Sequence, residues 1–288
     1  MTNSSVCADQ VVIVTGAARG MGRLMALGIA NAGASVVVVD QLQDELNGVM
    51  DEIKKQTACP PLAIALDVTD ERAVSAMVKS AIERFGRIDA LVNNAGIGPY
   101  FIRKDFKHRR VGLWEVTPEK WRRMVDVNLN GFFYVTSTVL HAMLPRRRGR
   151  IVTVTTSLYS MINRGSVVYG GTKAAIEANM SALALDLKYN GIDGITANVL
   201  IPGGPVDTPF IPNESGFDRA TLIRPEVMVP PVLWLLSDQA KNVSGYRIIA
   251  QEWDSRLPVE QAFAASSAPI AWPQIGGQPL DVGGQTRR

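Results

Sequence analysis

A run of four valines at 36–39 constrains the fold of this chain more than any other feature of its sequence. The run lies within Ser35–Asp40, where apolar β-branched side chains fill successive positions and so point to both faces of a strand. A strand that is apolar on both faces is typical of a parallel sheet with helices on each side. The sequence therefore predicts an α/β protein.

Similar apolar runs alternate with segments of helical periodicity. Strands are predicted at 10–15, 35–40, 61–67, 88–93, 150–155, 194–200 and 246–250, and helices at 22–33, 42–55, 70–85, 117–144, 168–189 and 225–236. Because strands separated by helices form right-handed crossovers, this order predicts a doubly wound parallel sheet, the Rossmann fold. We expect about seven strands with helices on both faces, in one catalytic domain over 1–254.

Two segments interrupt the pattern. An insertion at 98–116 carries both aromatic and basic side chains, and it either covers a site for an anionic substrate or is an ordinary solvated loop. After Asp254 the chain is rich in Ala, Ser, Pro, Gly and Gln. This extension, 255–288, is expected to be disordered or to act as an arm on a neighbouring subunit.

Composition excludes several classes of protein. The net charge of +3 is too small to indicate nucleic-acid binding, and no apolar run is long enough to span a membrane. No secretory signal is visible, and Cys7 and Cys59 have neither metal-ligand spacing nor a disulfide framework. We expect a cytoplasmic enzyme with no metal, acting on a small molecule.

A glycine-rich turn joins the first predicted strand to the first helix. Such a turn lets the backbone approach a pyrophosphate, and the helix N-terminus supplies N–H donors and a positive dipole. The candidate cofactor-binding residues of the turn are Gly16, Arg19, Gly20, Met21 and Gly22.

The second predicted strand ends in Asp40, where an acid can accept hydrogen bonds from the adenosine ribose. A carboxylate there repels the 2′-phosphate of NADP, and like charges about 4 Å apart cost several kcal/mol at an intermediate dielectric. Arg19, beside the phosphate turn, could instead pair with that phosphate. Asp40 favours NAD over NADP as the cofactor.

Tyr169 and Lys173 lie four residues apart, on one face of a predicted helix. Oxidation of an alcohol needs a base for the hydroxyl proton, and a phenol with a pKa of about 10 is too weak at neutral pH. A nearby ammonium lowers that pKa. The pair therefore indicates proton transfer to or from an alcohol or ketone.

With these motifs together, the chain resembles the short-chain dehydrogenase/reductase family in its compact one-domain form. The resemblance covers about 11–254. It rests on the glycine turn and on Asp67-Val68, Asn93-Asn94-Ala95-Gly96, Asn128, Tyr169-x-x-x-Lys173 and Pro202-Gly203.

The resemblance implies a role for each matching position. Tyr169 is the general acid/base, Lys173 lowers its pKa and holds the nicotinamide ribose, and Asn128 fixes a water that joins Lys173 to solvent. The other implied cofactor contacts are Asp67 and Val68 at the adenine, Asn94, Ala95 and Gly96 along the groove, and Pro202, Gly203 and Thr208 near the nicotinamide. The resemblance also implies a homotetramer in which the Asn128 and Tyr169 helices pair across subunits.

Two positions depart from the family pattern. The serine that should hydrogen-bond the substrate oxygen normally stands thirteen residues before the tyrosine, where this chain has Thr156. Ser157 is the next residue, and we expect Ser157 to be the catalytic hydroxyl, with Thr156 as the alternative. Thr208 follows Pro202-Gly203 one residue later than is usual.

These motifs predict an NAD(H)-dependent oxidoreductase acting on a secondary alcohol or ketone. The alternative is an NADPH-dependent ketone or 3-ketoacyl reductase of the same fold. A non-catalytic NAD sensor would lack Asn128, Tyr169 and Lys173, and a sugar-nucleotide epimerase would need a larger C-terminal domain.

Overall fold

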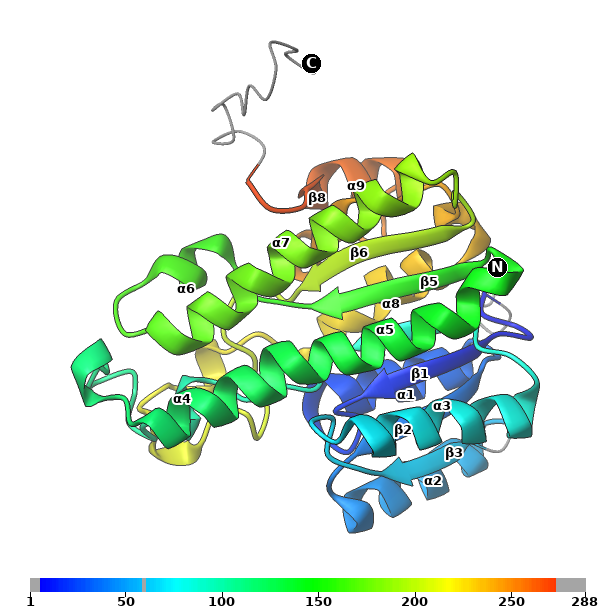
Figure 1. Ribbon diagram of the computed structural model, residues 1–288. Coiled ribbons are helices and arrows are strands. Elements are labelled where there is room, and N and C mark those ends of the chain that lie inside the picture. Colours follow the sequence, from blue (N-terminus) through cyan, green and yellow to red (C-terminus); the bar gives the residue numbers. More distant parts are fainter. Residues whose placement is uncertain (1–5, 59–60, 273–288) are drawn as a thin grey trace, which may run out of the picture.

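The computed structural model describes residues 6–58 and 61–272, and Cys59 and the last part of the extension, 273–288, lie outside them. Its centre is one sheet, in the order β3-β2-β1-β4-β5-β6-β7-β8 (Figure 1). The strands are β1 Val11–Thr15, β2 Ser35–Asp40, β3 Leu62–Ala65, β4 Ala90–Asn93, β5 Gly149–Val154, β6 Ile195–Ile201, β7 Tyr246–Ile249 and β8 Ser267–Pro269. All neighbouring strands are parallel except β7 and β8. The predicted doubly wound sheet is confirmed.

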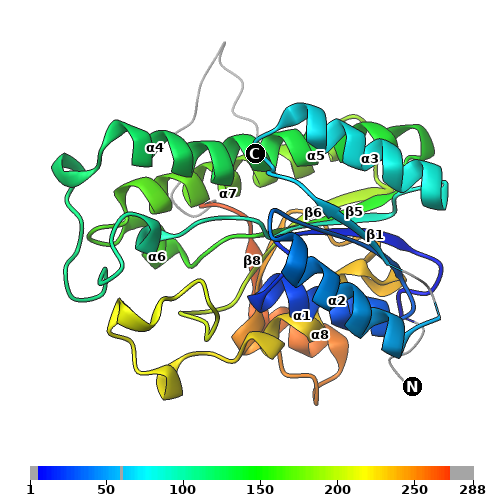
Figure 2. The ribbon, with the colours of Figure 1, turned by 90° about the horizontal axis from the view of Figure 1, so that it is seen from below.

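Helices cover both faces of the sheet. They are α1 Gly20–Asn31, α2 Gln43–Gln56, α3 Glu71–Phe85, α4 Pro118–Val125, α5 Gly131–Met143, α6 Leu158–Ile162, α7 Val167–Tyr189, α8 Val229–Leu236 and α9 Val259–Ser266. Figure 2 shows α1, α2 and α8 on one side of the sheet and α3, α5 and α7 on the other.

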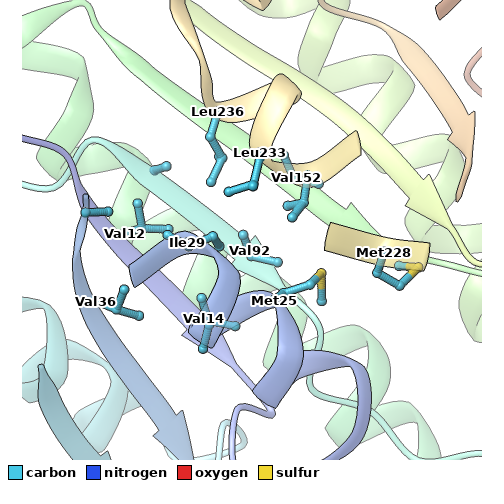
Figure 3. Packing of buried hydrophobic residues seen from close by; sticks show 14 of the residues in the cluster. Val12, Val14, Met25, Ile29, Val36, Val92, Val152, Met228, Leu233 and Leu236 are labelled. Carbon is cyan, nitrogen blue, oxygen red and sulfur yellow. The ribbon is translucent and has the colours of Figure 1, made fainter. Parts of the chain in front are cut away.

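The four valines of β2 contribute to the hydrophobic clusters on both faces of the sheet. Val36 and Val38 pack with α1 and α8, in the cluster shown in Figure 3. Val37 and Val39 point the other way and join the cluster beneath α3, α5 and α7. All four valines are at most 1% exposed, as expected for a strand covered on both faces.

The predicted helix at 117–144 is continuous, but it is divided into α4 and α5 by a π-helical turn. Thr117 caps its start and Pro118 takes the first helical position, as the sequence indicates. Between α4 and α5 the residues Asp126–Asn130 form a π-helical turn, which contains Asn128. Such turns are frequent at functional sites.

The sheet has eight strands rather than the expected seven or so, and the eighth comes from the C-terminal extension. Residues of α9 and β8 pack on the same domain, and β8 pairs antiparallel with β7. Phe263 of α9 lies against Trp234, with ring centroids 4.9 Å apart. Residues 259–269 of the extension thus pack with the sheet of their own chain. The sequence did not indicate β8, because a three-residue strand without a β-branched run leaves no periodic signal.

No helix within the described ranges is long and apolar enough to cross a membrane. Nor do the described residues gather three or more His, Cys, Asp or Glu side chains where a metal ion could be held.

Candidate active site

The candidate residues lie where the parallel strands end. The glycine turn follows β1, Asp40 ends β2, Asp67 and Val68 follow β3, and 94–96 follow β4. Thr156 and Ser157 follow β5, whereas Pro202, Gly203 and Thr208 follow β6. In Figure 1, α6 and the loop after β6 lie beyond the arrowheads of these strands. This edge is where ligands bind in open parallel sheets.

The glycine turn has the geometry of a phosphate cradle. Gly16 and Gly20 have φ angles of +65° and +58°, in the left-handed region that favours glycine. A Cβ at Gly22 would lie 2.0 Å from the carbonyl oxygen of Gly16, so no other side chain fits there. Because these positions leave no room for side chains, the backbone N–H groups at the start of α1 are accessible to a pyrophosphate.

Neighbouring segments hold this turn in place. The side-chain amide of Asn94 donates to the carbonyls of Thr15 and Gly16, at 3.1 and 3.0 Å. Thr15 Oγ1 accepts from the backbone N–H groups of Asn94 and Ala95. A Cβ at Gly20 would lie 3.1 Å from Thr208, which places Thr208 beside the turn. The segments after β1, β4 and β6 therefore form one wall.

Asp40 lies against the same turn. Its carboxylate accepts from the backbone N–H of Ala18, at 3.1 Å, and from those of Gln41 and Leu42. Arg19 is exposed at the N-cap of α1, and its side chain forms no ion pair within the described part of the chain. Both residues that bear on the choice between NAD and NADP are thus near the phosphate turn.

Asp67 is engaged by protein groups. Its carboxylate accepts from Thr69 and pairs with Arg123 of α4 over 2.8 Å. Although burial raises the pKa of Asp67, these hydrogen bonds hold it below its ordinary value. The adenine contact expected for Asp67 and Val68 stays a prediction.

Asn128, Lys173 and Gly96 come together beside the ends of β4 and β5. Asn128 donates to the carbonyl of Ile97 at 2.9 Å and to Thr172 at 3.1 Å, and it accepts from the N–H of Ile97. A Cβ at Gly96 would lie 3.2 Å from Asn128 Oδ1 and 3.6 Å from Lys173 Nζ. A cavity of about 10 Å³, lined in part by Asn128 and Lys173, is close to the size that holds one water. It is a suitable place for the water expected beside Asn128.

Lys173 is 6% exposed, and its ammonium donates to the carbonyl of Val154 at 3.0 Å. Burial lowers the pKa of Lys173 to about 8, against the opposing effect of the Glu177 carboxylate. Burial raises the pKa of Tyr169 to about 12, although a hydrogen bond with Thr156 acts to lower it. The lowering of the Tyr169 pKa expected beside Lys173 and the nicotinamide stays a prediction.

The structure separates the two candidate hydroxyls. Thr156 lies close enough to Tyr169 that a hydrogen bond with it acts to lower the pKa of the phenol. Ser157 instead caps α6, where its Oγ accepts from the N–H of Ser160 at 3.1 Å and lies 2.8 Å from Ser160 Oγ. Helix α6 was not predicted from the sequence, so the role of Ser157 as its N-cap was not foreseen. This arrangement favours Thr156, the alternative, over Ser157.

Aromatic rings line the side of the site next to Tyr169. The ring of Phe210 lies 6.4 Å from the rings of both Tyr169 and Tyr100, and Tyr100 packs edge-on against Phe106 at 5.9 Å. The sequence placed these aromatics in loops but gave no sign that they meet. They form an apolar wall beside the phenol.

The basic insertion 98–116 is mostly engaged with its surroundings. Arg103 pairs with Glu115, Lys107 donates to the carbonyl of Gly216, and Arg110 stacks over Phe106 at 4.5 Å. The contact with Gly216 joins the insertion to the loop after β6. The insertion therefore borders the candidate substrate side.

The chain matches a family model described as short chain dehydrogenase over residues 10–215. It is 31% identical to a (2S)-[(R)-hydroxy(phenyl)methyl]succinyl-CoA dehydrogenase subunit of Thauera aromatica, over 82% of this chain and 93% of that protein. It is also 31% identical to a 3-oxoacyl-[acyl-carrier-protein] reductase of Thermotoga maritima, over 82% of this chain and 94% of the relative.

Solved structures agree in fold. A Pseudomonas syringae protein described as a short chain dehydrogenase superposes with a TM-score of 0.75 at 27% identity, over 86% of this chain and 97% of its own. A Shigella flexneri protein solved with NADP gives a TM-score of 0.76 at 24% identity, over 86% and 99%. The family model covers well over half of the chain, and the glycine turn, Asn128, Tyr169 and Lys173 fall within the matched residues. The chain belongs to the short-chain dehydrogenase/reductase family of oxidoreductases.

Proposed function

We propose that this protein transfers a hydride between NAD(H) and a secondary alcohol or ketone, with Tyr169 as the general acid/base. One observation carries the proposal: Tyr169 lies one helical turn before the buried ammonium of Lys173, next to the sheet edge that also carries Thr156 and the glycine cradle. Family membership supports the same reaction class.

The nicotinamide cofactor supplies hydride exchange when it is bound. Gly16, Gly20 and Gly22 would hold its pyrophosphate, and Lys173 its nicotinamide ribose. During reduction, Tyr169 Oη gives its proton to the substrate oxygen while the Thr156 hydroxyl donates a hydrogen bond to that oxygen. A pKa of about 12 keeps the phenol protonated for this step. For oxidation Tyr169 must first lose its own proton, because only the phenolate can take up the proton of the alcohol, and a nearby cation favours that charged form.

The substrate class follows from the wall beside Tyr169. Phe210 presents its ring to that of Tyr169, and Tyr100 packs edge-on against Phe210. Apolar walls with few polar groups are typical of small-molecule sites. We infer that the group next to the reacting carbon is apolar.

Asp40 makes NAD our proposed cofactor. We expect NAD⁺ to raise the melting temperature of the protein, since a ligand at about a hundred times its dissociation constant adds roughly 2.7 kcal/mol. NADP⁺ should have little effect, and Asp40→Ser should weaken NAD⁺ and admit NADP⁺ beside Arg19. Asp44→Ser, on the neighbouring α2, is the matched control. Thermal-shift titration with each nucleotide makes the measurement, and a response to NADP⁺ alone would contradict the assignment.

That second result would favour an NADPH-dependent ketone or 3-ketoacyl reductase. The similarity to the Thermotoga maritima 3-oxoacyl-[acyl-carrier-protein] reductase supports this alternative, as does the exposed Arg19.

Nucleotide affinity should depend on the charge of Lys173. Because its pKa is about 8, the ammonium that would hold the ribose loses its proton as pH rises through that value. We expect the dissociation constant of NAD⁺ to increase above pH 8, and this rise to be absent in Lys173→Gln. Calorimetric titration at several pH values tests it. The same pH dependence in both proteins would assign it to another group.

A homotetramer in the cytoplasm remains our proposal for assembly and location. Phe133 of α5 and Leu185 and Tyr189 of α7 are exposed by more than 60%. Apolar side chains on these two helices support a contact between subunits there.

A further inference from the structure

A buried acid and a buried arginine lie behind the turn that carries Thr156. Glu177 is on α7, one helical turn after Lys173, and is 0% exposed. Arg247 is on β7, next to the buried Ile248, and is 6% exposed. Arg247 Nε donates to Glu177 Oε1 at 2.7 Å.

Three successive residues, the last of β5 and the two after it, are each held by one charged side chain of this group. Lys173 Nζ donates to the carbonyl of Val154 at 3.0 Å. Thr155 Oγ1 donates to Glu177 Oε2 at 2.9 Å. Arg247 Nη2 donates to the carbonyl of Thr156 at 3.0 Å.

These contacts satisfy most of the polar atoms that burial would otherwise leave unpaired. Both carboxylate oxygens of Glu177 accept a hydrogen bond, and Arg247 donates through two different nitrogens. A buried ion pair is often no better for stability than an apolar pair of similar volume. The fork of Arg247 does, however, fix the position of two groups at once, which a lysine cannot reproduce.

We propose that Glu177 and Arg247 are positioning residues that hold the turn Val154–Thr155–Thr156, so that the Thr156 hydroxyl meets Tyr169 and the substrate oxygen. This inference rests on the proposed function. Arg247 acts through the backbone of Thr156, and Glu177 acts through Thr155 and Arg247. A displacement of about 1 Å at such a hydroxyl can cost a hundredfold in rate.

Glu177 has a second effect, on the charge of Lys173. Its carboxylate opposes the lowering of the Lys173 pKa by burial, while the guanidinium of Arg247 faces the same carboxylate from β7. The backbone N–H of Ala271, from the C-terminal extension, lies 3.5 Å from Glu177 Oε1. The group is therefore enclosed by α7, β7, the end of β5 and the extension.

The first experiment is Arg247→Lys in the full-length protein. The charge next to Glu177 is kept, but the bond to the Thr156 carbonyl is lost. We expect kcat to fall at least tenfold. In a thermal-shift titration, the nucleotide concentration at the midpoint should change by less than twofold. The matched control is Arg87→Lys, because Arg87 Nε also donates to a buried carboxylate, that of Asp89, at 2.7 Å. This pair lies just before β4, at the ends where the parallel strands begin and the candidate site is absent. The kcat of Arg87→Lys should stay within twofold of wild type.

Glu177→Gln is the second variant and uses a binding readout. An amide can still accept from Arg247 and contact Thr155, but the negative charge is gone. The pH at which NAD⁺ affinity declines should move below that of the wild type. This variant decides the question if Arg247→Lys does not fold.

Three outcomes would overturn the proposal. They are an unchanged kcat in folded Arg247→Lys, an equal loss in Arg87→Lys, or an unshifted pH dependence in Glu177→Gln. Failure of the proposed function is distinguishable, because the wild type would then turn over no alcohol or ketone with either nucleotide. The Glu177→Gln binding arm still tests the charge coupling in that case.

Discussion

Replacing Tyr169 with phenylalanine is expected to lower kcat about a thousandfold, because the proton donor and acceptor is lost while the ring remains. The ring contact with Phe210, at 6.4 Å between centroids, does not need the hydroxyl. The fold and the apolar wall should therefore survive. Turnover of a ketone with NADH, measured beside wild type, makes the test.

Nucleotide binding provides the control for this variant. The glycine cradle follows β1 and Asp40 ends β2, whereas the phenol comes from α7. Tyr169→Phe should keep the thermal shift of the wild type with NAD⁺. Tyr159→Phe, on α6 with a 71% exposed side chain, is a matched change that should leave kcat unaltered. If Tyr169→Phe kept more than a tenth of the wild-type kcat, another group would have to be the acid.

Thr156→Val is expected to lower kcat about a hundredfold, the usual effect of removing one hydrogen-bond donor to a developing oxyanion. Valine keeps the β-branched shape, so that the turn after β5 should be preserved. The phenol of Tyr169 would also lose its hydrogen-bond partner, whose effect is to lower the pKa of Tyr169. That pKa should rise further above its ordinary value, which weakens Tyr169 as a base in oxidation.

Ser157→Ala is the matched variant, because it removes the neighbouring hydroxyl. Ser157 caps α6 through the N–H of Ser160, so its loss should cost about 1 kcal/mol of stability. Its kcat should remain close to that of the wild type. Steady-state kinetics and thermal unfolding of both variants separate the two roles, and the opposite ranking of the kcat values would restore Ser157 as the catalytic hydroxyl.

Much of the fold was predictable because its signals are local. The valines of β2 indicated a doubly covered strand, and they fill both cores. Thr117 and Pro118 indicated the start of α4, where they lie. The eighth strand and α6 were missed, since three- and five-residue elements carry too few positions to show a period.

The sequence by itself determined the residue types at the ends of the first two parallel strands, the glycine cradle and Asp40, and the helical pair Tyr169 and Lys173. Topology then brings these ends to one edge of the sheet. Only the tertiary structure placed Ser157 at the N-cap of α6, because that depends on how the turn after β5 leaves the sheet. It also brought together Glu177 and Arg247, which are 70 residues apart in the chain. An arginine within an apolar strand was their one sequence signal, and its partner could not be identified because long-range pairing leaves no periodicity in the sequence.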